Sequence, residues 1–411
     1  MADTSPGDDQ LTIRTLTDAD LPVFSEVLAT AFLIDHSAEF LAAERSAFEP
    51  ARSHAVFDGE TMIGTGQLLS RRIVVPGAEP VPVGAVTSIG VAPGHRRRGV
   101  LSRIMRGQLE FLHEAGEPLA ILWASEGGIY GRFGYGLGTQ HTQITVPRGT
   151  AFRRDVAVDP DPVRELPREQ AVPIMRDLYD KLWPSRTGYL DRTTDGTWEY
   201  HLFDDAGRRG GQTAMRFAVH PQAYAVYRAK EDWQARGPRA RVTVHELTAA
   251  TPAAYAAMVR YLLDMDLVGE VVLRAGTDEP LVHMLADPRA ALRTLFDALW
   301  VRVVDVDRAL TARRYPVPVD LVLDVDDAVC PWNAGRWRLV AGPDGRAEVT
   351  RTDAPADLAL DVAALGTVFF GGTRLATLAA AGRVREHSPG ALATASLAFL
   401  HDDEPRCLEA F

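Results

Sequence analysis

The sequence predicts a mixed α/β and α+β protein with two similar α/β units in tandem, followed by a smaller α+β unit. The chain has 411 residues, which is too long for one typical domain and allows about two or three. Strand and helix patterns alternate in the first part of the chain and start again near Thr150. After Tyr315, strands come first and helices follow. We therefore expect units at residues 1–149, 150–298 and 299–411.

The first unit combines strands with two helices. Thr17 is a typical helix cap, and Asp20 suits the positive end of the helix dipole. The Asp58-Gly59 pair between two apolar runs predicts a hairpin. The expected elements are a disordered lead-in at 1–10, strands at 11–16, 54–57, 61–70, 83–91 and 119–123, and helices at 17–32 and 101–112.

The second unit repeats this order of elements. Thr251-Pro252 predicts the start of a helix, because proline is favoured at the first helical position. The expected elements are strands at 163–166, 214–219, 223–228 and 241–247, and helices at 168–182 and 252–262. Where the first unit has arginines and a glycine, this one has residues 248–251, so we expect it to lack a phosphate site and to be catalytically silent.

The third unit begins with strands and ends with helices. A Gly-Pro-Asp-Gly turn at 342–345 predicts a hairpin. The expected strands lie at 317–325, 335–341 and 347–352, and the expected helices at 362–369, 373–381 and 391–400.

An anion site is expected where the strand ending at Val91 turns into the next helix. The first backbone N–H groups of a helix have no intrahelical partner and carry the positive end of its dipole, so they suit a diphosphate. Gly99 permits close approach, and Arg96, Arg97 and Arg98 add charge-assisted bonds. The stretch has neither a GKS/GKT loop nor a G-x-G-x-x-G pattern, which argues for a diphosphate ligand outside those two classes.

This turn resembles the pyrophosphate loop of the GNAT acetyltransferases, in which Arg or Gln is followed by two residues, Gly, one residue, and Gly or Ala. Here Leu101 stands at the last position. VAPGHRRRGVL followed by ASEGGIYGRFGYG resembles the Eis branch of that family, in which the leucine is usual. The resemblance implies two tandem GNAT-like domains, a sterol-carrier-protein-like third domain, to which residues 361–382 are similar, and a homo-oligomer, a hexamer in many Eis proteins.

The resemblance also implies acetyl-CoA as cosubstrate. Its diphosphate would lie on the turn, its pantetheine along the edge of the preceding strand, and its thioester near residues 125–130, whose N–H groups would polarise it. An ordinary strand-to-helix junction is the alternative. The expected contacts are Ile89, Gly90, Val91, Arg96, Arg97, Arg98, Gly99, Val100, Leu101, Ser102, Ser125 and Glu126.

Acetyl transfer to an amine needs an acid for the departing thiolate and a base for the attacking ammonium. Tyr130 is the best-placed acid, although it is equally one of several structural aromatics; the Eis resemblance implies that it is the proton donor and that Tyr135 is not catalytic. For the base, Glu126 is the local candidate, or else a cap of the next turn. The resemblance implies instead the carboxylate of Phe411, and both candidates stay open.

The acceptor is expected to be a small cationic amine. A net charge of −11 disfavours nucleic acid and attracts amines. The resemblance implies an aminoglycoside-like acceptor, acetylated at one or several positions and held by acids, for which Asp35, Glu39 and Glu409 are available. Protein lysines or polyamines are rival acceptors, and a non-enzymatic lipid-binding or acyl-CoA-binding protein is the alternative function.

The remaining expectations concern location, cysteines and metals. Apolar runs fall short of the roughly 18 residues that span a bilayer, and the first ten residues are acidic, so we expect a cytoplasmic protein with no membrane partner. Cys330 and Cys407 are then expected as thiols. No His, Cys, Asp or Glu cluster has metal spacing, so no metal is expected, and His95 and His113 are interpreted as surface residues.

Overall fold

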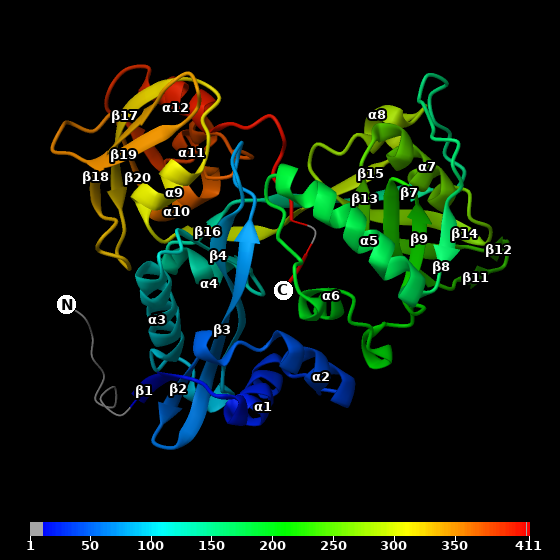
Figure 1. Cartoon of the computed structure of the whole chain (residues 1–411), viewed down its shortest axis with the longest axis horizontal. Coiled ribbons are helices and arrows are strands. Elements are labelled where there is room, and N and C mark those ends of the chain that lie inside the picture. The colour runs from blue at the N-terminus through cyan, green and yellow to red at the C-terminus, as the bar shows by residue number, and fades with distance from the viewer. Residues whose placement is uncertain (1–10, 408) are drawn as a thin grey trace.

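The computed structural model describes residues 11–407 and 409–411, and it shows three bodies in contact (Figure 1). The first unit, blue to cyan, lies at the lower left of the figure, the second, green, at the right, and the third, yellow to red, above the first. The lead-in expected at residues 1–10 lies outside the described residues. This arrangement confirms the predicted fold class of two α/β units followed by a smaller α+β unit.

The first unit is built on a sheet that has seven strands within the described residues. In spatial order they are β1 (Leu11–Thr15), β2 (Ser53–Asp58), β3 (Thr61–Ile73), β4 (Val81–Val91), β5 (Leu119–Trp123), β16 (Leu299–Val303) and β6 (Gly136–Leu137). Its helices are α1 (Leu21–Phe32), α2 (Ala38–Ala47), α3 (Val100–Ala115) and α4 (Gly127–Tyr130). The strands and the helix predicted around the basic turn are confirmed, whereas the sequence interpretation had no helix at α2.

The second unit has its own sheet, with seven strands in the described part of the chain. Their order is β15 (Leu292–Asp297), β7 (Gln140–Pro147), β14 (Val268–Ala275), β13 (Ala240–Ala249), β10 (Ala223–Lys230), β9 (Arg216–His220) and β8 (Arg164–Leu166). A short ribbon pairs β11 (Trp233–Gln234) with β12 (Gly237–Pro238). Its helices are α5 (Arg168–Leu182), α6 (Asp195–His201), α7 (Pro252–Leu263) and α8 (Leu281–Met284).

The third unit carries a sheet that, among the described residues, has five strands. They are β19 (Ala347–Arg351), β18 (Gly335–Ala341), β17 (Val319–Asp326), β20 (Leu358–Asp361) and β21 (Val384–Glu386). Its helices are α9 (Val306–Ala312), α10 (Val362–Val368), α11 (Leu375–Ala380) and α12 (Ala391–Phe399). The predicted strand pair around the Gly-Pro-Asp-Gly turn is confirmed.

Two strands link the units by joining sheets across the boundaries expected at residues 149 and 298. Strand β7 precedes the first boundary but pairs with β14 and β15 of the second sheet. Strand β16 follows the second boundary but pairs with β5 and β6 of the first sheet. The exact domain limits remain a prediction, and the sheets show that the first two units are structurally interlocked.

One apolar core joins the first and third units. Val301 of β16 and Ile121 of β5 belong to the same buried cluster as Leu323 of β17 and Leu365 of α10. Helix α10 lies very close to Gly136 of β6, where a Cβ atom would lie 1.9 Å from the carbonyl oxygen of Ala363. Only a residue without a side chain therefore allows α10 to approach this strand.

The helices of the described residues are too short or too polar to cross a membrane. Both cysteines, Cys330 and Cys407, are buried and unpaired.

The close approach at Gly136 gives a test of how the first and third units dock. We expect Gly136→Ala to lower the free energy of unfolding by about 3 kcal/mol, because the added methyl group overlaps the α10 backbone. Gly342→Ala is the matched control, since the atom nearest to its added Cβ is Asp344 Oδ1 at 3.6 Å. Unfolding midpoints in urea measure both, and equal midpoints would contradict this account of the interface.

Candidate active site

A bulge in β4 opens the first sheet beside β5. The two strands pair in parallel from Val83 with Leu119 to Val86 with Leu122, and their pairing stops there. Just beyond, Ser88 has a φ of 53°, and the register between β3 and β4 shifts between Thr65 and Gln67. Thr65 Oγ1 donates a hydrogen bond of 2.9 Å to the Ser88 carbonyl oxygen, which holds the bulge. Residues 89–91 therefore diverge from β5 and leave a wedge between the two strands.

The basic turn at the end of β4 presents an open helix N-terminus. Helix α3 begins at Val100, and its cap is Gly99, with a φ of 76°. Arg97 takes a φ of 64°, which bends the chain sharply before the helix. Because the cap has no side chain, no hydroxyl or carboxylate of its own covers the first N–H groups of α3. This end of the helix is thus available to an anionic ligand.

A cavity of about 610 Å³ lies between this turn and the end of β5, and we name it the donor cavity. All of the predicted cofactor-binding residues except Arg98 line it: Ile89, Gly90, Val91, Arg96, Arg97, Gly99, Val100, Leu101, Ser102, Ser125 and Glu126. Arg98 instead points to Asp58, with Nη1 at 2.9 Å from Oδ2. Its guanidinium is thus engaged by Asp58 and by His95 Nδ1, and Arg98 itself does not line the donor cavity.

A second hollow of about 350 Å³ adjoins the donor cavity, and we name it the acceptor chamber. Phe32, Ile89, Ser125 and Tyr130 line both spaces, so the two meet at these side chains. The other residues that line the chamber are Leu28, Ile34, His36, Phe40, Glu44, Ala47, Gln67, Leu69, Val86, Thr87, Ser88, Trp123, Ala124, Tyr200 and Phe411. The two predicted catalytic residues, Tyr130 and Phe411, are thus brought to one chamber.

Tyr130 lies at the junction as a buried phenol. It ends α4 and is 6% exposed. Burial raises its pKa above the ordinary value of 10, and the nearby Glu126 raises it further, while a hydrogen bond with Ser125 acts in the opposite direction. The side chain is therefore protonated at neutral pH and has a proton to give. Tyr135 packs edge-on against it, with ring centroids 6.1 Å apart, and lines neither the donor cavity nor the acceptor chamber.

The acids expected for the acceptor do not line the acceptor chamber. Asp35 and Glu39 are exposed outside it, and Glu409 is buried in a separate ion-pair cluster. Their place is taken by Glu44 of α2, which sequence reasoning missed because no amphipathic pattern marked that helix. Ser25 Oγ donates to Glu44 Oε2 at 2.5 Å. Burial raises the pKa of Glu44 above its ordinary value.

All three units contribute to the acceptor chamber. Tyr200 comes from α6 of the second unit, and Phe411 from the tail that follows the third. Trp123, at the end of β5, donates a hydrogen bond of 2.8 Å from Nε1 to the carbonyl oxygen of Glu409. Glu126 lines only the donor cavity, and its side chain makes no cap bond to α4. Of the two candidate bases, Phe411 is the one that lines the chamber.

The matching helix of the second unit, α7, is closed at its N-terminus. Thr251 Oγ1 accepts a hydrogen bond of 3.2 Å from the N–H of Ala254, and Pro252 has no N–H to offer. The protein itself thus occupies the position that α3 leaves open. This difference agrees with the expectation that the second unit is catalytically silent, which stays a prediction.

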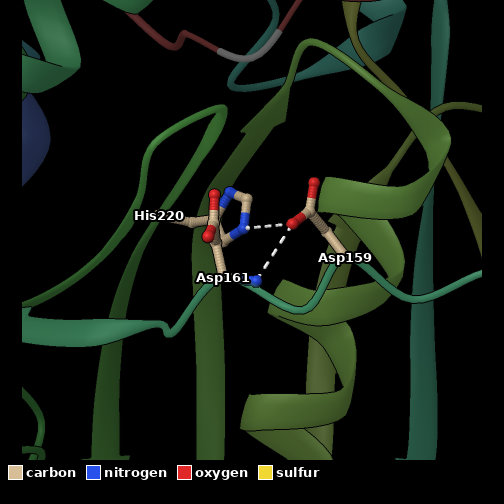
Figure 2. A group of neighbouring side chains, drawn as sticks. All are labelled: Asp159, Asp161 and His220. Carbon is tan, nitrogen blue, oxygen red and sulfur yellow. Dashed lines mark hydrogen bonds and ion pairs between the residues drawn. The ribbon is translucent and has the colours of Figure 1, made fainter.

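One group of described residues has the composition of a metal site: Asp159, Asp161 and His220 (Figure 2). His220 Nδ1 accepts the N–H of Gln222 at 3.1 Å, so the neutral ring carries its proton on Nε2. That proton faces Asp159 Oδ1 at 3.5 Å, and the same carboxylate accepts the N–H of Asp161 at 3.0 Å. In this tautomer Nε2 carries the proton and offers no lone pair to a metal.

Comparisons with known families and proteins agree with this geometry. Residues 12–138 and 188–303 each match an acetyltransferase (GNAT) domain, and residues 306–408 match a sterol carrier protein domain. An uncharacterized N-acetyltransferase of Streptomyces avermitilis is 40% identical, over 94% of this chain and 96% of the relative. N-acetyltransferase Eis of Mycobacterium tuberculosis is 34% identical, over 84% of each chain.

Solved structures show the same three-unit architecture. Eis1 from Mycobacterium abscessus superposes with a TM-score of 0.86 at 32% identity, over 97% of this chain and 100% of that one. A GCN5-related N-acetyltransferase from Anabaena variabilis reaches 0.82 at 18% identity, over 98% of this chain and 100% of that one. The second likeness shows the fold alone. Together, the relatives confirm the predicted resemblance.

Arg96 and Arg97 line the donor cavity, whereas Arg98 pairs with Asp58, and this difference gives a test of the anion site. We expect Arg96→Gln with Arg97→Gln to weaken coenzyme A binding by about tenfold or more, because charge-assisted bonds to the diphosphate are lost. Arg98→Gln, the matched control, should stay within about threefold of the unaltered protein. Titration calorimetry measures both, and a larger loss in the control than in the double variant would refute the assignment.

Proposed function

The chain belongs to the Eis family of GNAT N-acetyltransferases, and we propose that it transfers the acetyl group of acetyl-CoA to an amine bound in the acceptor chamber. The observation that carries this proposal is the position of Tyr130, which lines both the donor cavity and the acceptor chamber. A proton donor at that junction can reach a thioester from one side while an amine approaches from the other.

In this proposal, acetyl-CoA binds in the donor cavity in a single orientation, with its diphosphate at the basic turn and its thioester near Tyr130. The diphosphate lies on the N–H groups at the start of α3 with Arg96 and Arg97 beside it. The pantetheine follows residues 89–91, whose backbone is free of β5. The thioester then lies near Ser125 and Tyr130.

The chemical step forms a nitrogen–carbon bond and breaks the carbon–sulfur bond. The bound ammonium loses a proton to a base, the neutral amine attacks the thioester carbonyl, and backbone N–H groups near Ser125 stabilise the oxyanion. Tyr130 then gives its proton to the departing thiolate, and the second proton of the acylated nitrogen passes to the Tyr130 phenolate. We propose the Phe411 carboxylate as the base, because Phe411 lines the same chamber as Tyr130, whereas Glu126 lines only the donor cavity.

The lining of the acceptor chamber favours an amine that is attached to an apolar body. Most of the described lining residues are apolar or aromatic, and Glu44 supplies the acidic side chain among them. An aminoglycoside carries several ammonium groups, and burying them beside so few acids costs hydration free energy. We therefore expect amines with one charge and an aromatic or aliphatic body to be better acceptors than aminoglycosides or polyamines. A protein lysine is a further candidate.

The relatives that are named N-acetyltransferases indicate that this chain is an enzyme, so the alternative of a purely non-enzymatic carrier protein is set aside.

Homo-oligomer formation, as a hexamer, and a cytoplasmic location stay predictions. Assembly gains support from β15, which exposes Leu292, Leu295 and Phe296 on a strand at the edge of the second sheet.

Tyr135, which packs against Tyr130, serves as a control for the role of Tyr130. We expect Tyr130→Phe to lower kcat by about 100-fold with little change in acetyl-CoA affinity, because a proton donor is lost while the aromatic packing stays. Tyr135→Phe should keep kcat within about twofold, since Tyr135 lines neither the donor cavity nor the acceptor chamber and its hydroxyl has no hydrogen-bond partner among the described residues. Steady-state thiol release measures both, and an equal loss in both variants would contradict a special role for Tyr130.

The acceptor class is tested by a panel of amines with one assay. We expect kcat/KM to be about tenfold higher for an arylalkylamine such as phenylethylamine than for spermidine or an aminoglycoside, because the chamber has few acids. A lysine-containing peptide tests the protein alternative. Highest kcat/KM with the aminoglycoside would overturn the apolar assignment while leaving the acetyl transfer itself intact.

A further inference from the structure

The tail of the chain returns from the third unit to the space between the first two (Figure 1). After α12 it passes the loop that follows α5, where the N–H of Arg406 donates to the carbonyl oxygen of Thr187 at 3.1 Å. The guanidinium of Arg406 bonds the hydroxyl of Tyr189 at 3.0 Å. A Cβ atom on Gly188 would lie 2.8 Å from the Arg406 carbonyl oxygen, so the two backbones are in direct contact.

Farther along the tail, the side chain of Glu409 binds two buried arginines from different units. Its Oε1 accepts Arg71 Nη1 at 2.5 Å, and its Oε2 accepts Arg192 Nε at 2.7 Å. Arg71 belongs to β3 of the first unit, whereas Arg192 lies in the second, between α5 and α6. Glu409 is 4% exposed, so both bonds are shielded from water.

Each arginine is also held by a carboxylate of the second unit. Arg71 Nε donates to Asp191 Oδ1 at 3.2 Å, and Arg192 Nη1 donates to Glu246 Oε1 at 3.1 Å. The Arg192 guanidinium also lies 4.2 Å from the centre of the Tyr179 ring. The arginines are therefore held in place independently of the tail, and they form a rigid receptor for one carboxylate.

The carboxylate of Glu409 stays charged in this receptor. Burial alone raises its pKa, but the charges of Arg71, Arg192 and His201 outweigh burial and lower the pKa to about 2. At neutral pH the tail is thus held by an ionised group. Breaking a buried charge pair by removing one partner is costly, because the other charge is left unpaired.

The position of Phe411 follows from this anchor. Two residues of extended chain span at most about 7 Å, so a fixed Glu409 confines Phe411 to the neighbourhood of the acceptor chamber. The Glu409 carbonyl oxygen is held in addition by Trp123, which itself lines the chamber. Ala410, between the two, is exposed and adds no buried contact.

We propose that Glu409 is a positioning residue of the acetyl transfer: bound by Arg71 and Arg192, it holds Phe411 in the acceptor chamber that Tyr130 also lines. The inference rests on the proposed function of Tyr130 and Phe411. Glu409 touches no reacting atom, and it acts by fixing the tail. It also ties catalysis to the docking of all three units, because the two arginines and the tail come one from each.

The test compares Glu409→Gln and Glu409→Asp with Glu404→Gln, a control five residues earlier in the same tail. We expect Glu409→Gln to lower kcat about tenfold or more and to leave acetyl-CoA affinity by calorimetry within about twofold, because Phe411 is released while the donor cavity is untouched. Tryptic cleavage after Arg406, followed by mass spectrometry, should be slow in the unaltered protein and faster in this variant. The control should match the unaltered protein, and Glu409→Asp should fall between.

Several outcomes would overturn the positioning role. They are an unchanged kcat in folded Glu409→Gln, a parallel loss of acetyl-CoA binding, rapid cleavage after Arg406 in the unaltered protein, or failure of both Glu409 variants to fold, which would make the residue structural. Absence of acetyl transfer by the unaltered protein with any amine would instead refute the proposed function, and the cleavage rates would still report whether Glu409 holds the tail.

Discussion

The separation of β4 from β5 beyond Val86 is the constraint on which the rest of the site depends. If the two strands stayed paired, the edge of β4 would be covered and the start of α3 would face no cavity. The bulge at Ser88, held by Thr65, prevents that pairing. As a result, an open helix N-terminus, a free strand edge and a buried phenol face a single connected space.

That space is completed by parts of the chain that lie far apart in the sequence. The first unit supplies the donor cavity, α6 of the second adds Tyr200, and the tail after the third adds Phe411. Exchanged strands β7 and β16 interlock the first two units, and a shared core fixes the third. The acceptor chamber is therefore a property of the assembled chain and of no single unit.

The sequence predicts well what local chemistry decides. The basic turn before α3, and the Thr251-Pro252 start of α7, have short-range signals, and the structure has helices at both positions. Helix α2 was not predicted, because its apolar residues form no clear stripe along one face, and Glu44 was therefore not identified as a site residue. The exchange of β7 and β16 and the direction of Arg98 depend on tertiary pairing, which one sequence does not display. Glu409 was expected to bind the acceptor, whereas two distant arginines hold it.

The proposed function depends on the basic turn before α3 binding the diphosphate of coenzyme A, so that the thiol lies near Tyr130. A crystal structure of the protein with coenzyme A would show both positions. We expect the diphosphate within hydrogen-bonding distance of the N–H groups of residues 99–102, and the sulfur within about 4 Å of Tyr130 Oη. A diphosphate bound elsewhere, or a sulfur remote from Tyr130, would refute the proposed function.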